Sequence, residues 1–140
     1  MKNTVLSLMK MKESREKISM LTCYDYSTAR LMESSGINMI LVGDSLGMTM
    51  QGYSDTIPVT MEEMIVYGRS VVRGCENTFV VVDMPFMSYQ ASVEQAVVNA
   101  GVTFRLRCEV APGKFETEDF LYEHGIRDYL AELAGDDPLT

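Results

Sequence analysis

Three short apolar runs, each ending at an acidic residue, constrain the fold of this 140-residue chain more than any other feature. They are KISMLTCYD (17–25), INMILVGDS (37–45) and NTFVVVDMP (77–85). The second and third are apolar at successive positions, which is typical of strands buried on both faces of a parallel sheet. Helical patterns separate the three runs. The alternation therefore predicts an α/β fold built from right-handed βαβ units.

Start and stop signals place the intervening helices. STARLMESSG (27–36) reads as a helix that stops at Gly36. Thr60 and Glu63 have capping-box spacing, so a helix is predicted over 60–74, closed by Gly74. A helix is also predicted from Ser92, a short amphipathic helix near the N-terminus, and a loop over 46–59.

The pattern changes after Gly101. Residues 102–110 (VTFRLRCEV) alternate apolar and polar, which predicts a half-exposed strand. Residues 115–123 could return as a hairpin, and 125–133 form an amphipathic helix pattern. We therefore predict a parallel β/α unit over 1–101 and a small α+β appendage over 102–140.

Composition excludes several classes of protein. The net charge of −8 and pI of about 4.6 argue against nucleic-acid binding, which needs clustered Lys and Arg, but not against a small anionic substrate. One histidine, His124, rules out a multi-histidine metal site, and the three dispersed cysteines favour reduced thiols in the cytoplasm. The N-terminal apolar run is too short for a signal peptide, and no segment has the length of a membrane span.

Asp44 and Asp83 are the candidate metal ligands. Each follows a predicted buried strand, and one crossover separates the two strands, so the strands are expected to be neighbours about 4.8 Å apart. Ligands bind at this edge of parallel sheets, and oxygen ligands without nearby His or Cys favour Mg²⁺. The alternative is that both aspartates cap turns or helices.

Three further polar residues near these strand ends have their own interpretations. Ser45 would stand beside the metal as a hydrogen-bond donor. Asp25 is interpreted as a helix N-cap, and Tyr24 either lines a pocket or simply packs. The glycine-rich stretch SLGMTMQGYSDT lacks phosphate-loop spacing.

Longer signatures resemble a known family. LVGDSLGM, PVT and DMPFMSY, within residues 1–101, resemble the start of ketopantoate hydroxymethyltransferase. The resemblance implies a (β/α)₈ barrel, homo-oligomers and a cytoplasmic enzyme of pantothenate biosynthesis. It implies transfer of a one-carbon unit from 5,10-methylenetetrahydrofolate to 3-methyl-2-oxobutanoate, giving 2-dehydropantoate, with Mg²⁺ chelating the keto acid and stabilising its enolate.

The resemblance also implies site residues. Asp44 and Asp83 match the family's metal-site aspartates, and Ser45 matches a residue that contacts the keto acid; all three are expected to bind substrate. The substrate lysine, a further metal-site glutamate and the general-base glutamate of the family have no counterpart here, so no catalytic residue is assigned. At least four of the eight barrel units are missing, so little or no turnover is expected of this chain alone.

Residues 102–140, including FLYEHGIRDYLAEL, resemble a segment from the ATPase subunit of DNA gyrase and its type IIA topoisomerase relatives, a segment that carries neither the ATP site nor the DNA-cleavage residues. The chain therefore reads as a fusion of a truncated hydroxymethyltransferase with a short appendage. The alternative function is a non-catalytic fusion that is inert or associates with a partner through unpaired sheet edges. A DNA-binding role is disfavoured by the acidic composition.

Overall fold

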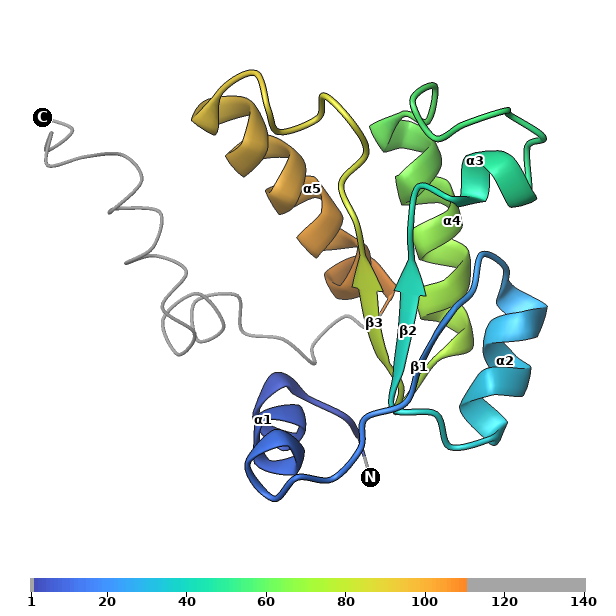
Figure 1. Cartoon of the computed structure of the whole chain (residues 1–140), viewed down its shortest axis with the longest axis vertical. Helices are drawn as coiled ribbons and strands as arrows, with labels where there is room; N and C mark the ends of the chain where they lie inside the picture. Colours follow the sequence, from blue (N-terminus) through green and yellow to red (C-terminus); the bar gives the residue numbers. More distant parts are fainter. Residues whose placement is uncertain (1, 111–140) are drawn as a thin grey trace, which may run out of the picture.

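The computed structural model describes residues 2–110 of the chain, with eight elements in the order helix, strand, helix, strand, two helices, strand, helix (Figure 1). The strands are short and the helices that follow them run back along the sheet. The elements are α1 (Val5–Glu13), β1 (Met20–Thr22), α2 (Tyr26–Ser34), β2 (Met39–Val42), α3 (Leu46–Thr49), α4 (Met61–Gly74), β3 (Phe79–Val82) and α5 (Val93–Val110).

The three strands form one parallel sheet in the order β1-β2-β3. Met20 pairs with Met39, and Met39 in turn pairs with Phe79, so the strands are in register from their first residues. β2 is central, and Val42 pairs with Val82 at the far end. The predicted α/β class, the parallel direction and the adjacency of the second and third strands are confirmed.

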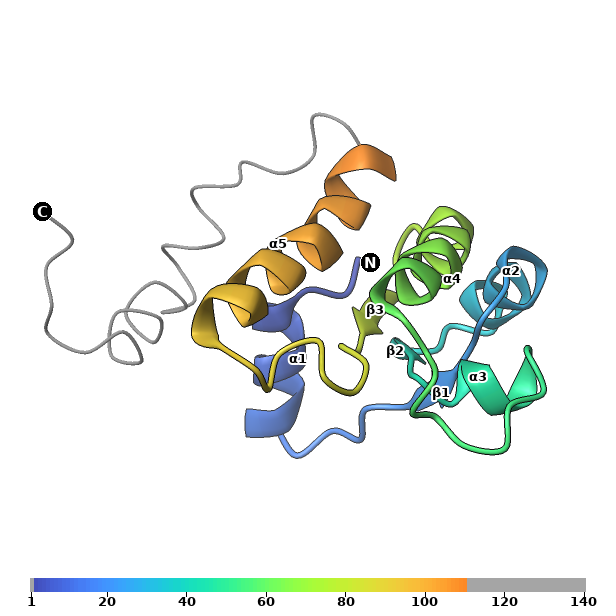
Figure 2. The same ribbon diagram turned by 90° about the horizontal axis from the view of Figure 1, so that it is seen from above.

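Three helices cover one face of this sheet. Figure 2 shows α2, α4 and α5 lying along the same side of the strands, and α4 packs against α2, α5, β2 and β3. Ile40 and Val42 of β2 point into this layer and are fully buried, whereas Met39 and Leu41, on the opposite face, are only half-buried. The core therefore lies between the sheet and the helices α2 and α4.

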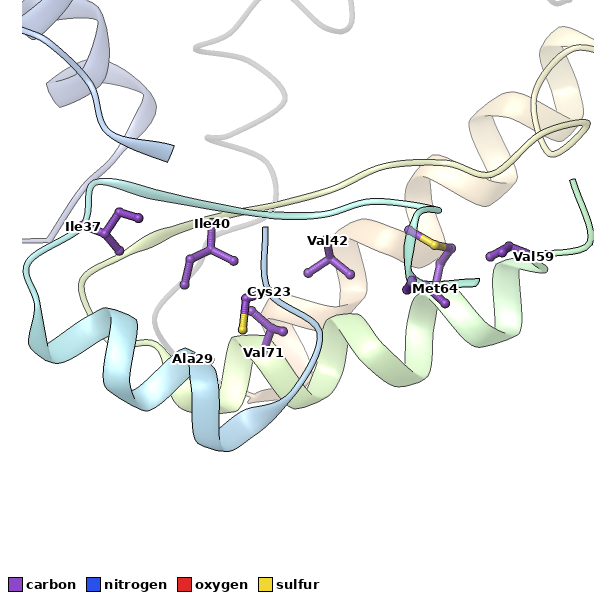
Figure 3. Close-up of a cluster of buried hydrophobic side chains, with 9 residues drawn as sticks. Cys23, Ala29, Ile37, Ile40, Val42, Val59, Met64 and Val71 are labelled. Atoms are coloured by element: carbon purple, nitrogen blue, oxygen red, sulfur yellow. The ribbon is translucent and has the colours of Figure 1, made fainter. Parts of the chain in front are cut away.

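The core is small and aliphatic. Figure 3 shows Ile40, Val42 and Cys23 on the sheet side meeting Ala29 of α2 and Val71 of α4. Met64, at the start of α4, fills the end nearest the strand exits and is fully buried. Removing such apolar side chains from water is the main favourable term that holds this layer together.

β1 is shorter than the predicted apolar run. Met20 and Leu21 are 50% and 57% exposed, because β1 is an edge strand with only β2 beside it. The predicted amphipathic helix near the N-terminus is α1, which begins at the cap Thr4 and buries Leu8. The predicted loop over 46–59 contains one short helix, α3, before the loop proper.

The predicted helix ends are confirmed, but Gly74 ends its helix for a different reason from the predicted one. Thr60 and Glu63 form a reciprocal capping box at the start of α4. Gly36 follows α2 with a φ of +77°, a left-handed conformation that glycine adopts without strain. Gly74 ends α4, but its role is close packing: a Cβ there would lie 2.7 Å from Cβ of Ala29 in α2.

The predicted strand over 102–110 is wrong. The structure continues α5 through Gly101 to Val110 as one helix. Ser92 begins that helix by accepting a hydrogen bond from the Gln95 backbone N–H, and once begun a helix gains one hydrogen bond per added residue. An alternating pattern without a turn before it does not stop such a helix. The predicted hairpin over 115–123, the helix over 125–133 and His124 lie outside the described residues.

Candidate functional site

The carboxyl ends of β2 and β3 lie side by side. The backbone N–H of Asp83 donates to the carbonyl oxygen of Val42 at 3.0 Å, one step beyond the last strand pair. Gly43 and Asp44 continue from Val42 into the turn that leads to Ser45 and α3. The two predicted metal-site aspartates therefore leave neighbouring strands at the same edge, as the sequence predicts.

Gly43 brings its backbone close to the side chains of Asp83 and Ser45. A Cβ built on Gly43 would lie 3.5 Å from Oδ2 of Asp83 and 3.6 Å from Oγ of Ser45, which is ordinary van der Waals contact. Gly43 itself is buried, and the two oxygens face the same side of it.

The surroundings of Asp83 raise the pKa of its carboxyl group. Its side chain reaches solvent, yet the surrounding protein atoms remove enough water to raise its pKa, and the negative charge of Asp44 raises it further. A carboxylate whose proton affinity is raised by a neighbouring carboxylate is also placed to share a cation with it, which would relieve the repulsion.

Tyr24 joins the site from the exit of β1. The Cys23 backbone N–H donates to the Leu41 carbonyl oxygen at 3.1 Å, which keeps this segment beside β2. The Tyr24 hydroxyl then lies 2.5 Å from Oγ of Ser45. The sequence left open whether Tyr24 lines a pocket or packs inside the protein. The structure supports the packing role, because the ring packs against the core, and it adds the hydroxyl contact with Ser45.

Asp25 belongs to the fold and not to the site. Its Oδ1 accepts a hydrogen bond from the Thr28 backbone N–H at 2.8 Å, which makes it the N-cap of α2. The side-chain and backbone hydrogen bonds from Thr28 lower the pKa of its carboxyl group. The N-cap interpretation of Asp25 is confirmed.

The donor set at the strand exits suits Mg²⁺. Asp44 and Asp83 offer two carboxylates, and residues 2–110 contain no group of three His, Cys, Asp or Glu side chains placed to hold a metal. Mg²⁺ is commonly held by one or two carboxylates, with water and substrate oxygens completing its shell. Asp83 is exposed and Asp44 is partly exposed, so water and substrate oxygens can reach both carboxylates, and the residues present fit this ion.

No helix in the described part of the chain is long and apolar enough to cross a membrane.

The comparisons with known proteins point to one family. The model of the family described as ketopantoate hydroxymethyltransferase matches residues 2–124. The chain is 65% identical over 101 residues to 3-methyl-2-oxobutanoate hydroxymethyltransferase of Clostridium novyi (strain NT), and 59% identical over 101 residues to that of Enterococcus faecalis (strain ATCC 700802 / V583). Each match covers 72% of this chain and 37% of the relative.

A more distant relative gives the same result. The enzyme of that name from Geotalea daltonii (strain DSM 22248 / JCM 15807 / FRC-32) is 57% identical over 98 residues, covering 70% of this chain and 37% of the relative. The chain therefore spans just over a third of the length of these relatives. Its sequence, over the 123 residues from 2 to 124, belongs to the ketopantoate hydroxymethyltransferase family.

Proposed function

We propose that this chain carries the metal and keto-acid half-site of a hydroxymethyltransferase. Its substrate would be 3-methyl-2-oxobutanoate, the compound in the names of its relatives. The supporting observation is that Asp44 and Asp83 leave neighbouring strands at one edge of the parallel sheet, and that Oδ2 of Asp83 and Oγ of Ser45 both face Gly43. In this proposal both aspartates hold Mg²⁺, and all three side chains contact the keto acid.

Each residue has a distinct task in this proposal. When bound between Asp44 and Asp83, Mg²⁺ supplies Lewis-acid polarisation of the keto acid. Ser45 donates a hydrogen bond to a keto-acid oxygen. The co-substrate is 5,10-methylenetetrahydrofolate and the product is 2-dehydropantoate, as the resemblance implies, and the reaction takes place in the cytoplasm.

The chain alone is not expected to turn over. We infer that β1, β2 and β3 with their helices are the first units of a (β/α)₈ barrel, and that the catalytic base and the substrate lysine belong to later units. A positioned general base contributes about 10²–10⁴-fold to a rate. The half-site should therefore bind the keto acid without supporting measurable catalysis.

Calorimetric titration tests this proposal directly. The folded chain is titrated with 3-methyl-2-oxobutanoate in the presence and absence of Mg²⁺. We expect heat of binding only with Mg²⁺ present, and loss of that heat in Asp83→Ala. The matched control is Glu76→Ala, since Glu76 is an exposed acid that precedes the opposite end of the same strand, β3.

Two results would contradict the proposal: no heat from wild-type protein with a native circular dichroism spectrum, or equal binding by Asp83→Ala. Either would favour the second candidate, a non-catalytic chain that associates through its sheet edges. The exposed strand β1, with Met20 and Leu21 at the surface, is the observation that favours it. Sedimentation velocity would then show concentration-dependent association.

A further inference from the structure

The hydroxyl of Tyr24 touches the hydroxyl of Ser45, and nothing in the matches to known proteins assigns a role to that contact. We propose that Tyr24 is a positioning residue: it donates to Oγ of Ser45 and so turns the proton of Ser45 toward an anionic oxygen ligand beside Asp83. This inference rests on the proposed function, because the keto acid is the ligand that would receive the proton.

The backbone holds Tyr24 on both sides. Cys23, just before it, is buried and bonded to Leu41, and Asp25, just after it, caps α2. The ring of Tyr24 is half-buried and packs against the core. Its hydroxyl therefore has little freedom to leave Ser45, which is the condition for a positioning role.

Ser45 is free to take this role because its side chain does not cap α3. It occupies the N-cap position of that helix, yet its hydroxyl makes no capping hydrogen bond. Its carbonyl oxygen accepts hydrogen bonds from Met48 and Thr49, so the backbone of Ser45 is fixed while its hydroxyl is bonded to Tyr24. An N-cap side chain bonds the helix backbone from an extended conformation, whereas Ser45 has helical φ and ψ of −56° and −14°, so its hydroxyl does not cap α3 and is left to bond Tyr24.

The direction of the hydrogen bond follows from charge. Each hydroxyl carries one proton, so only one of Tyr24 and Ser45 donates to the other. If Ser45 donated, its lone pairs would face the ligand and repel an anionic oxygen beside Asp83. A phenol is a stronger hydrogen-bond donor than an alcohol, so Tyr24 is the donor, and the proton of Ser45 remains for the ligand.

The first test is a double-substitution cycle in the calorimetric titration. Tyr24→Phe should weaken binding of 3-methyl-2-oxobutanoate about tenfold at saturating Mg²⁺, the effect of one lost hydrogen bond. The same substitution in a Ser45→Ala background should change the affinity less than twofold, since its acceptor is gone. Tyr26→Phe is the matched control, because Tyr26 is a half-exposed tyrosine two residues away, and it should bind as wild type.

A purely structural role for the Tyr24 ring predicts something else. The tenfold loss would then appear equally with and without the Ser45 hydroxyl, and that result overturns the inference. Equal binding by Tyr24→Phe and wild type also overturns it.

The second test needs no ligand. The ¹³C signal of the Tyr24 ζ-carbon, assigned by its absence in Tyr24→Phe, reports on the hydrogen bonding of the phenol. Donation to Ser45 predicts that Ser45→Ala moves this signal upfield, and an unmoved signal overturns the inference. If the signal moves but wild-type protein binds no keto acid, the Tyr24–Ser45 bond is supported and the proposed function is the part that fails.

Discussion

Glu33 holds α2 against the start of β3, and neutralising it should destabilise the fold by a predictable amount. Its carboxylate accepts hydrogen bonds from the backbone N–H of Asn77 at 2.8 Å and of Thr78 at 3.0 Å, and from Nδ2 of Asn77 at 3.1 Å. Thr78 is only 3% exposed. Glu33→Gln removes the charge and replaces one acceptor oxygen with an NH₂ donor, which leaves a backbone N–H of this segment without its partner.

The magnitude follows from the pKa of Glu33. Partial burial alone would raise it, but the hydrogen bonds from Thr78 and Asn77 outweigh burial and lower the pKa from 4.5 to about 2. At about 1.36 kcal/mol per pKa unit this shift corresponds to roughly 3 kcal/mol. Glu33 is partly open to solvent, and screening reduces the expected contribution to about 1–2 kcal/mol.

The sign of the pH dependence is fixed by the lowered pKa. The stabilisation is fully present above the unfolded value of 4.5 and is lost as the pH falls toward about 2. We therefore expect the difference in unfolding free energy between wild type and Glu33→Gln to be largest at pH 7 and to shrink by about half or more at pH 3.

Urea unfolding followed by circular dichroism measures both quantities. Glu76→Gln, in the loop that precedes β3, is the matched control and should unfold as wild type at pH 7, because Glu76 is exposed. Equal midpoints for wild type and Glu33→Gln at pH 7 would refute the reasoning. A difference that stays constant from pH 7 to pH 3 would also refute it, since it would come from packing and not from charge.

Four further substitutions test other parts of the structure by the same unfolding assay. Gly74→Ala should destabilise the fold by about 1–3 kcal/mol, because the added Cβ would press on Ala29. Gly101→Ala adds its Cβ in open space and should stabilise α5 by up to about 1 kcal/mol if the helix continues through that position. Asp25→Ala should cost about 1 kcal/mol through loss of the α2 cap. In metal-free buffer at pH 7, Asp83→Asn should stabilise the fold by a few tenths of a kcal/mol, because burial and Asp44 raise the pKa of Asp83. This gain in stability should vanish below pH 3.8, where the carboxyl group is protonated in both the folded and the unfolded chain. A destabilised variant at pH 7 would contradict the prediction.

Periodicity predicted the parallel sheet because β2, the central strand, and β3, the edge strand paired with it, are apolar at successive residues. It failed at 102–110, where alternation of apolar and polar residues indicated a strand and the structure has a helix. Alternation measures only which residues share a face, whereas helix continuation depends on hydrogen bonds begun ten residues earlier at Ser92. The packing role of Gly74 was also invisible, since nothing local marks the approach of Ala29.

The candidate site was predictable to the extent that it lies at strand ends. The exits of the second and third strands placed Asp44 and Asp83 at one edge without knowledge of any contact. The choice between a pocket and a packing role for Tyr24 required the third dimension, because its partner Ser45 is 21 residues away. The signal that could have indicated this contact is an aromatic residue at the exit of β1, the strand next to the one that leads to Ser45.

The two ends of the sheet contribute differently to the stability of this fold. At the exit end, burial and the repulsion from Asp44 raise the pKa of Asp83, which opposes folding. At the opposite end, polar side chains join the segments that precede the strands: Glu33 binds Asn77, and Asn38 accepts from the N–H and hydroxyl of Ser19. Because these bonds lie a full strand length from the aspartates, the site can retain unfavourable charge without loosening the contacts that hold the sheet. Substitutions at the exits should therefore change ligand affinity more than stability, and substitutions at the entrances should do the reverse.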